Sequence, residues 1–197
     1  MDAALPWSDW ALLPRAVDLI VAEVDAGRRQ VVECGSGVST IAIARRLAEL
    51  GDGRLAALEH DAAWAELIGA RLESEGLGDR ARVVEAPLVE QPLAQPGCRW
   101  YAQSGLDQLP GSGIELLLVD GPPAGEPDIE RSRYPALPVL LGRLAEDAII
   151  VLDDIDRPGE QWVLDAWERE AEHRFERRPE LRLAIGRRSA PASASPR

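Results

Sequence analysis

The chain has 197 residues, of which 46% are hydrophobic and 28% charged. This length suits one compact domain, and every apolar run is far shorter than the ~20 residues needed to cross a bilayer. The net charge is −12, and all 22 basic residues are arginines. An acidic chain disfavours nonspecific binding to nucleic acid, so we expect neither a nucleic-acid nor a membrane partner. No signal segment opens the sequence, which predicts a cytoplasmic protein.

Apolar runs alternate along the chain with patterns of helical spacing, which is typical of a parallel sheet covered on both faces. We expect residues 1–188 to form one domain and 189–197, rich in Ala, Ser and Pro, to form a disordered tail. The expected strands are 30–33, 54–58, 82–85, 114–119, 148–152, 174–177 and 181–185. The expected helices are 9–26, 38–50, 61–75, 135–144 and 158–172.

Two long segments, 86–113 and 121–133, carry many prolines and glycines and little periodicity. Long irregular loops in compact domains usually have a functional role. Both should leave the carboxyl ends of strands, where open α/β sheets bind ligands. We therefore expect them to cover a substrate site, with Trp100 or Tyr101 facing it. Trp7 and Trp10 either join this wall or act as packing anchors, whereas the spacing of three other tryptophans predicts core positions: Trp64, Trp162 and Trp167.

The strongest local motif is Glu33-Cys34-Gly35-Ser36-Gly37, at the junction of a strand and a helix. Glycines let the backbone approach a ligand closely, and the amides at a helix N-terminus face whatever lies on the loop. A dinucleotide site needs a small third residue for packing, where this chain has Thr40, and a P-loop needs a lysine. Glu33 would repel a pyrophosphate and favour a cationic ligand.

This motif resembles motif I of the class I S-adenosylmethionine-dependent methyltransferases, whose ligand carries an ammonium and a sulfonium. The resemblance implies that Glu59, which lies 24 residues after Gly35, holds both ribose hydroxyls. His60 would lie beside the adenine, Asp61 would cap the next helix, and Ala86 would offer its backbone to the adenine. The implied cofactor-binding set is Glu33, Gly35, Ser36, Gly37, Ser39, Glu59, His60, Ala86 and Asp120.

Three acids follow two further predicted strands. Asp120 ends the run Leu116–Val119, and Asp153 and Asp154 follow Leu152. Carboxylates at such positions are costly unless a cation or hydrogen bonds neutralise them. If the two strands are neighbours, the acids converge on a site for Mg²⁺ or a similar divalent cation. The alternative is that one acid of the Asp153–Asp154 pair caps the following helix and the other faces water.

Together with Asp120-Gly121-Pro122-Pro123 and Arg133–Pro138, these acids make residues 31–166 similar to bacterial O-methyltransferases related to the metal-dependent catechol and macrolide-sugar type. The resemblance implies a Rossmann-like seven-stranded α/β sheet, mostly parallel with an antiparallel last strand and helices on both faces. It also implies O-methylation of a small-molecule acceptor, and a homodimer is compatible with it.

One departure from that pattern is the missing lysine base. A divalent ion, if present, would bind the acceptor hydroxyl and lower its pKa. Without the metal, Asp120 or Asp154 would be the base, and Tyr134 is the nearest titratable donor. Arg131 and Arg133 are either a solvated pair or a clamp for an anionic substrate. Two alternatives stay open at this point: a metal-independent N- or carboxyl-methyltransferase on the same fold, and a nucleotide-binding module without catalysis.

Overall fold

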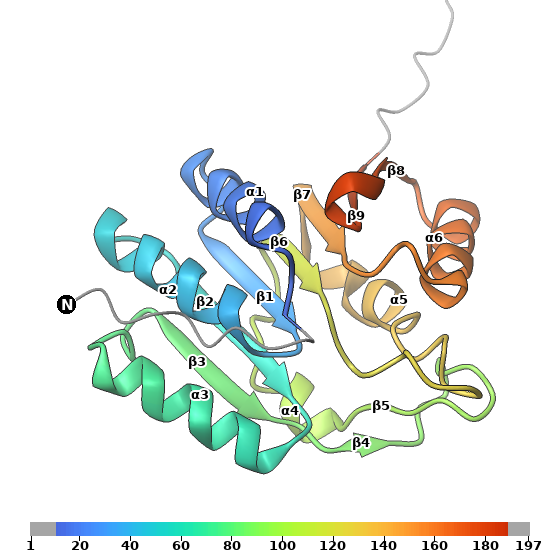
Figure 1. Cartoon of the computed structure of the whole chain (residues 1–197), viewed down its shortest axis with the longest axis horizontal. Helices are drawn as coiled ribbons and strands as arrows, with labels where there is room; N and C mark the ends of the chain where they lie inside the picture. Colours follow the sequence, from blue (N-terminus) through green and yellow to red (C-terminus); the bar gives the residue numbers. More distant parts are fainter. Residues whose placement is uncertain (1–10, 189–197) are drawn as a thin grey trace, which may run out of the picture.

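The computed structural model describes residues 11–188, which form a seven-stranded sheet between two layers of helices (Figure 1). The strand order is β3-β2-β1-β6-β7-β9-β8, and all neighbours are parallel except the pairs that include β9. The predicted mostly parallel sheet with an antiparallel last strand is therefore confirmed. The strands are β1 (Gln30–Cys34), β2 (Arg54–Glu59), β3 (Ala81–Glu85), β6 (Ile114–Val119), β7 (Leu144–Leu152), β8 (His173–Arg178) and β9 (Leu183–Arg188).

Helices cover both faces of this sheet. The helices are α1 (Pro14–Asp25), α2 (Val38–Leu50), α3 (Ala62–Ser74), α4 (Gln103–Leu106), α5 (Ala136–Leu140) and α6 (Pro158–Glu170). Helices α1 to α3 pack in one hydrophobic cluster and α4 to α6 in the other. Successive strand residues alternate between the clusters, with Val31 in the first and Val32 in the second. Burial on both faces explains why the central strands are continuous apolar runs.

The first helix begins later than its pattern suggests. We predicted a start at residue 9, but residues 1–10 lie outside the described part of the chain, and α1 begins at Pro14. Leu13 has φ −59° and ψ 143°, which is an extended conformation. The helical conformation is disfavoured for a residue that precedes a proline, whereas proline itself suits the first helical turn.

Two other boundaries shift for local reasons. The predicted helix 135–144 is shorter, because α5 gives way to a 3₁₀ turn, η1 (Leu141–Arg143), and β7 begins at Leu144. The first part of β7 includes exposed, charged Glu146 and Asp147, so it lacks the apolar signature of a buried strand. The last strand begins at Leu183 because η2 (Pro179–Leu181) and left-handed Arg182 precede it. A short hairpin, β4 (Leu88–Val89) with β5 (Trp100–Tyr101), lies in the first long loop.

The topology opens a crevice at the carboxyl ends of β1 and β6. The chain crosses from β1 to β2 on one side and later reaches β6 on the other, and ligands bind at such switch points in α/β sheets. Here two glycines meet, since Gly35 has φ +92° and a Cβ on it would lie 3.1 Å from the Gly121 nitrogen. The Gly121 amide also donates to the Cys34 carbonyl at 2.6 Å. The two loops that flank the crevice are thus held in contact through backbone atoms alone.

Within residues 11–188, none of the helices combines the length and apolarity that a membrane span requires.

We predict that Gly35→Ala lowers the free energy of unfolding by about 1–3 kcal/mol, because an L-residue is strained at this φ and its Cβ presses on the Gly121 backbone. Gly37→Ala is the matched control, since Gly37 has an extended φ of 170° and a Cβ there meets no atom within 4 Å. Urea unfolding of both variants checks this expectation. Equal stability of the two variants would contradict it.

Candidate active site

A cavity of about 530 Å³ opens at the crevice between β1 and β6. Both predicted loops contribute to it, because Tyr101 and residues 121–126 line the same cavity as Gly35 and Gly37. This confirms that the loops lie at the sheet edge where the glycine motif lies, although Trp100 is buried in the core. The other lining residues include Leu12, Ser36, Val38, Ser39, Glu59, His60, Asp61, Trp64, Asp120, Arg133, Asp154 and Arg157.

Glu33 lies beneath the glycine loop and is 1% exposed. Its carboxylate accepts hydrogen bonds from the Ser39 and Thr40 hydroxyls, and Thr40 Oγ1 in turn accepts from the Gly37 amide at 2.9 Å. Burial raises the pKa of Glu33 to about 7, although the two hydroxyl donors act in the opposite direction. Glu33 does not line the cavity, so the structure places it as a support of the loop and not as a surface for the ligand.

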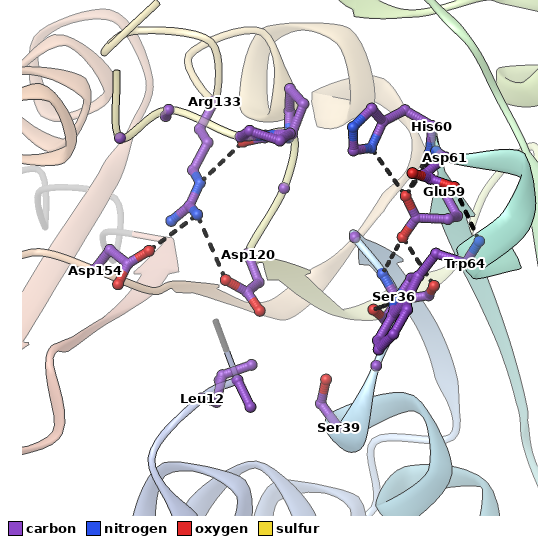
Figure 2. A pocket seen from close by; sticks show the side chains of 18 of the residues that line it. Leu12, Ser36, Ser39, Glu59, His60, Asp61, Trp64, Asp120, Arg133 and Asp154 are labelled. Carbon is purple, nitrogen blue, oxygen red and sulfur yellow. Dashed lines mark hydrogen bonds and ion pairs between the residues drawn. The ribbon is translucent and has the colours of Figure 1, made fainter. Parts of the chain in front are cut away.

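Glu59 ends β2 at the opposite wall of the cavity from Asp120 and Asp154 (Figure 2). Its Oε2 accepts from the amide and hydroxyl of Ser36 at 3.0 and 2.9 Å. Its Oε1 accepts from the backbone amides of His60 and Asp61 at 2.7 and 3.0 Å and lies 2.9 Å from His60 Nδ1. Burial alone would raise the pKa of Glu59, but these hydrogen bonds outweigh it and hold the pKa below its usual value. Glu59 is therefore an ionised acceptor at neutral pH.

Two of the donors to Glu59 are side chains, the Ser36 hydroxyl and the His60 ring. A hydroxyl can rotate and a half-exposed imidazole can turn, so a ligand with two adjacent hydroxyls can replace them without moving the backbone. The carboxylate would then keep its three amide donors. The Glu59 carboxylate can therefore accept hydrogen bonds from the two adjacent hydroxyls of a ribose.

Trp64 is a site residue that the sequence reasoning assigned to the core. It is only partly buried, lines the cavity and donates from its indole Nε1 to the Ser36 carbonyl at 2.8 Å. Asp61 caps α3 as predicted, by accepting from the Trp64 amide at 3.0 Å. The Asp61 cap could have indicated that Trp64 lies at the site. The third residue after an N-cap lies in the first helical turn, next to the end of the preceding strand.

Asp120, Asp153 and Asp154 converge as predicted, because β6 and β7 are neighbours. One carboxylate oxygen from each lies within 4.8 Å of the others. Burial raises the pKa of Asp120 and of Asp153, and repulsion among the three acids adds to the effect. Asp120 lines the cavity with a side chain that is 21% exposed, whereas Asp153 does not line it.

A guanidinium lies between these acids. Arg133 is 3% exposed, so it is not half of a solvated pair, and it also lines the cavity. Its Nη2 lies 3.0 Å from Asp154 Oδ2 and 3.5 Å from Asp120 Oδ1. Dashed lines mark both contacts in Figure 2. Arg157 and Arg182 also pair with Asp154, the former at 2.8 Å from Oδ2 and the latter with Oδ1. Both oxygens of Asp154 thus already face cations, and an ion at this place would compete with and repel the Arg133 guanidinium. The arrangement fits a divalent ion poorly.

Three other residues complete the placement of the predicted site. The Tyr134 hydroxyl donates to Glu170 in α6, and Tyr134 does not line the cavity, so the structure does not bring it to the predicted catalytic position. Ala86 is buried behind the wall and its amide donates to the Glu59 carbonyl at 2.7 Å. The Tyr101 hydroxyl is buried at the cavity without a hydrogen-bond partner among the described residues. Burial raises the pKa of Tyr101 well above its usual value, so this hydroxyl stays a donor.

The strand order and the cavity at the crevice between β1 and β6 are those of the Rossmann-like methyltransferase fold. Residues 32–155 match the family described as a methyltransferase domain, and the chain belongs to that family. No curated protein matches the chain in sequence.

Solved structures share the fold at low sequence identity. An SAH-bound methyltransferase from Podospora anserina has a TM-score of 0.71 at 15% identity, over 93% of this chain and 81% of that one. The O-methyltransferase TomG from Streptomyces achromogenes, in complex with SAM, has a TM-score of 0.60 at 18% identity, over 92% and 83%. An SAH-bound O-methyltransferase from Bacillus cereus has a TM-score of 0.65 at 14% identity, over 92% and 84%.

We predict a pH-dependent stabilisation by Glu33→Gln. An acid whose pKa is raised on folding does not destabilise the protein at pH values below its unfolded pKa. Its destabilising effect is complete at pH values above its folded pKa, which is about 7 for Glu33. The free energy of unfolding of the variant relative to wild type should therefore increase by about 2 kcal/mol between about pH 5.5 and pH 8. Urea unfolding at both pH values measures it, with exposed Glu85→Gln as the control for lost charge. A difference that does not vary with pH would count against a buried, protonated Glu33.

Proposed function

We propose that this chain transfers a methyl group from S-adenosylmethionine to a hydroxyl of a small molecule. The observation that carries the proposal is one continuous cavity with two chemically different ends. Glu59 and Trp64 lie at one end, Asp120 lies at the other, and the glycine loop runs between them. Structural neighbours whose names describe O-methyltransferases support the choice of oxygen as the acceptor atom.

The cofactor end offers an acceptor pair for ribose in Glu59 and an indole wall in Trp64. S-adenosylmethionine, when bound, supplies an electrophilic methyl group on its sulfonium. The glycine loop with its helix N-terminal amides would hold the amino-acid part of the ligand. Gly35 and Gly121 then fix the distance between this end and the acceptor end, because their backbones are in contact.

At the acceptor end, Asp120 is the candidate base, because its carboxylate faces the cavity. Asp154 is held on both oxygens by arginines and has less freedom to accept a proton. The acceptor oxygen would lose its proton to Asp120 as it attacks, and the position of Asp120 on a strand end orders the two groups for reaction. The Tyr101 hydroxyl has no hydrogen-bond partner within residues 11–188 and would donate to a bound ligand.

The acceptor end also has an apolar wall made of Leu12, Pro122, Pro123 and Ala124. Its lining suits an acceptor with an apolar body and a polar reacting group. We propose that the reaction takes place in the cytoplasm, and that one methyltransferase domain spans residues 1–188. The test is mass spectrometry of the products formed from S-adenosylmethionine and a panel of phenols, alcohols, amines and carboxylic acids. Methylated phenols or alcohols are the expected products, and products limited to amines or carboxylic acids would contradict methyl transfer to a hydroxyl.

We predict that Glu59→Ala raises the dissociation constants of SAM and SAH at least about tenfold, because two charge-assisted hydrogen bonds to the ribose are lost at about 1.5–3 kcal/mol each. Isothermal titration calorimetry measures the change. The control is Glu85→Ala, which removes an exposed acid from the end of the adjacent strand, paired in register with Glu59. Unchanged affinity in Glu59→Ala would overturn the proposed position of the ribose.

We predict that Asp120→Asn lowers kcat about 100-fold or more, since a positioned general base contributes roughly that factor. SAH affinity should stay within about threefold of wild type, because Glu59 forms the other end of the cavity. Asp128→Asn removes an exposed acid from the same loop and is the matched control. A kcat within a few-fold of wild type for Asp120→Asn would show that another group accepts the proton.

A further inference from the structure

We propose that Arg133 supplies the positive charge of the Asp120–Asp153–Asp154 cluster, so that this site positions its base with an arginine and works without a divalent metal. The second half of this inference rests on the proposed methyl transfer. The first half concerns the binding properties of the cluster and can be tested without any acceptor.

The contacts of Arg133 tie together both strand ends that carry the acids. Its Nε donates to the Pro122 carbonyl at 3.3 Å, in the loop after β6. Its Nη1 donates to the Asp153 carbonyl at 3.1 Å, at the end of β7. Its Nη2 lies 3.0 Å from the Asp154 carboxylate and 3.5 Å from the Asp120 carboxylate. A planar guanidinium carries donors that point in several directions. It can therefore bind two backbone carbonyls and two carboxylates at once.

The charges around Arg133 support the same conclusion. Glu160 is fully buried and its carboxylate has no hydrogen-bond donor among the described residues. Its Oε1 lies 3.5 Å from Arg133 Nη1 and 3.9 Å from Arg157 Nη1. A carboxylate buried in this way needs a nearby cation, and Arg133 is the most deeply buried guanidinium beside it. Four acids and three arginines therefore form one network, in which Arg133 occupies the centre.

Asp120 differs from the other acids of this network in its contact to Arg133 and in its access to the cavity. Its contact to Arg133 Nη2, at 3.5 Å, is longer than that of Asp154 at 3.0 Å, and the cavity reaches Asp120. Arg133 thus acts as a positioning residue, which orients Asp120 toward the cavity without fully occupying its oxygens. Removal of the Arg133 charge should have a second effect: it leaves three converging carboxylates without their cation, which is the ligand set that a divalent ion prefers.

The experiment is a titration of Mn²⁺ into the full chain, followed by calorimetry and by the electron paramagnetic resonance signal of the ion. Wild type should bind no Mn²⁺ at millimolar concentrations, and EDTA should leave its melting temperature and its methyl transfer unchanged. Arg133→Gln, which keeps a polar donor on a shorter side chain but removes the charge, should bind one Mn²⁺ with a dissociation constant at least about tenfold below the highest concentration at which wild type shows no binding. Arg133→Lys should restore the wild-type lack of binding.

Arg131→Gln is the matched control, since Arg131 is exposed, two residues away, and lies over the Trp162 ring. It should behave as wild type in every measurement. One Mn²⁺ bound to wild type and lost in Asp153→Asn would overturn the proposal, and this result does not depend on whether any Arg133 variant folds. Loss of wild-type methyl transfer in EDTA with recovery on Mn²⁺ or Mg²⁺ would also overturn it. Absence of methyl transfer under all conditions would instead refute the proposed function and leave the metal titration valid.

Discussion

The structure depends on the neutralisation of carboxylates that the sheet brings together at one edge. Strands β6 and β7 are buried on both faces and lie side by side, so their carboxyl ends must meet. Each end carries acids, and buried charges that repel one another are tolerated only with a cation among them. Arg133 reaches this place from the loop that follows β6 and binds the backbone of both strand ends. The course of residues 121–133, and with it the roof of the cavity, follows from that requirement.

The two glutamates of the cofactor end show how differently burial can act on the same side chain. Glu33 is surrounded by the core and has two hydroxyl donors, and burial prevails, so its pKa is raised to about 7. Glu59 is almost as inaccessible, but the His60 ring and several hydroxyl and backbone donors bind its carboxylate, and these hydrogen bonds keep its pKa below the usual value. Glu33 supports the glycine loop as a partly neutral side chain near pH 7, whereas Glu59 is an anion that lines the cavity. Their roles follow from their donors and not from exposure.

The sequence was sufficient to predict the sheet and the convergence of the glycine motif with Glu59 at one cavity. Both rest on local patterns: apolar runs for doubly buried strands, glycines at a strand–helix junction, and an acid at the end of the next strand. The helix start at Pro14 and the strand start at Leu144 were missed because proline geometry and charged strand residues override the apolar pattern. Trp64 was assigned to the core because helical spacing identifies a face but not what lies opposite that face.

The acceptor end depends on contacts between segments far apart in the chain, and no local pattern encodes them. The convergence of Asp120, Asp153 and Asp154 could be predicted, since topology alone brings strand ends together. The identity of the cation could not, because Arg133 looks the same as exposed Arg131 in the sequence, and only its burial at 3% distinguishes them. An arginine and a dication also have different consequences for a base. A dication binds its ligands directly and would occupy the Asp120 oxygens, whereas a guanidinium at 3.5 Å leaves the carboxylate able to accept a proton from the cavity. Under the proposed function, an internal arginine thus lets one of the acids take the place of the lysine base, since the chain contains no lysine.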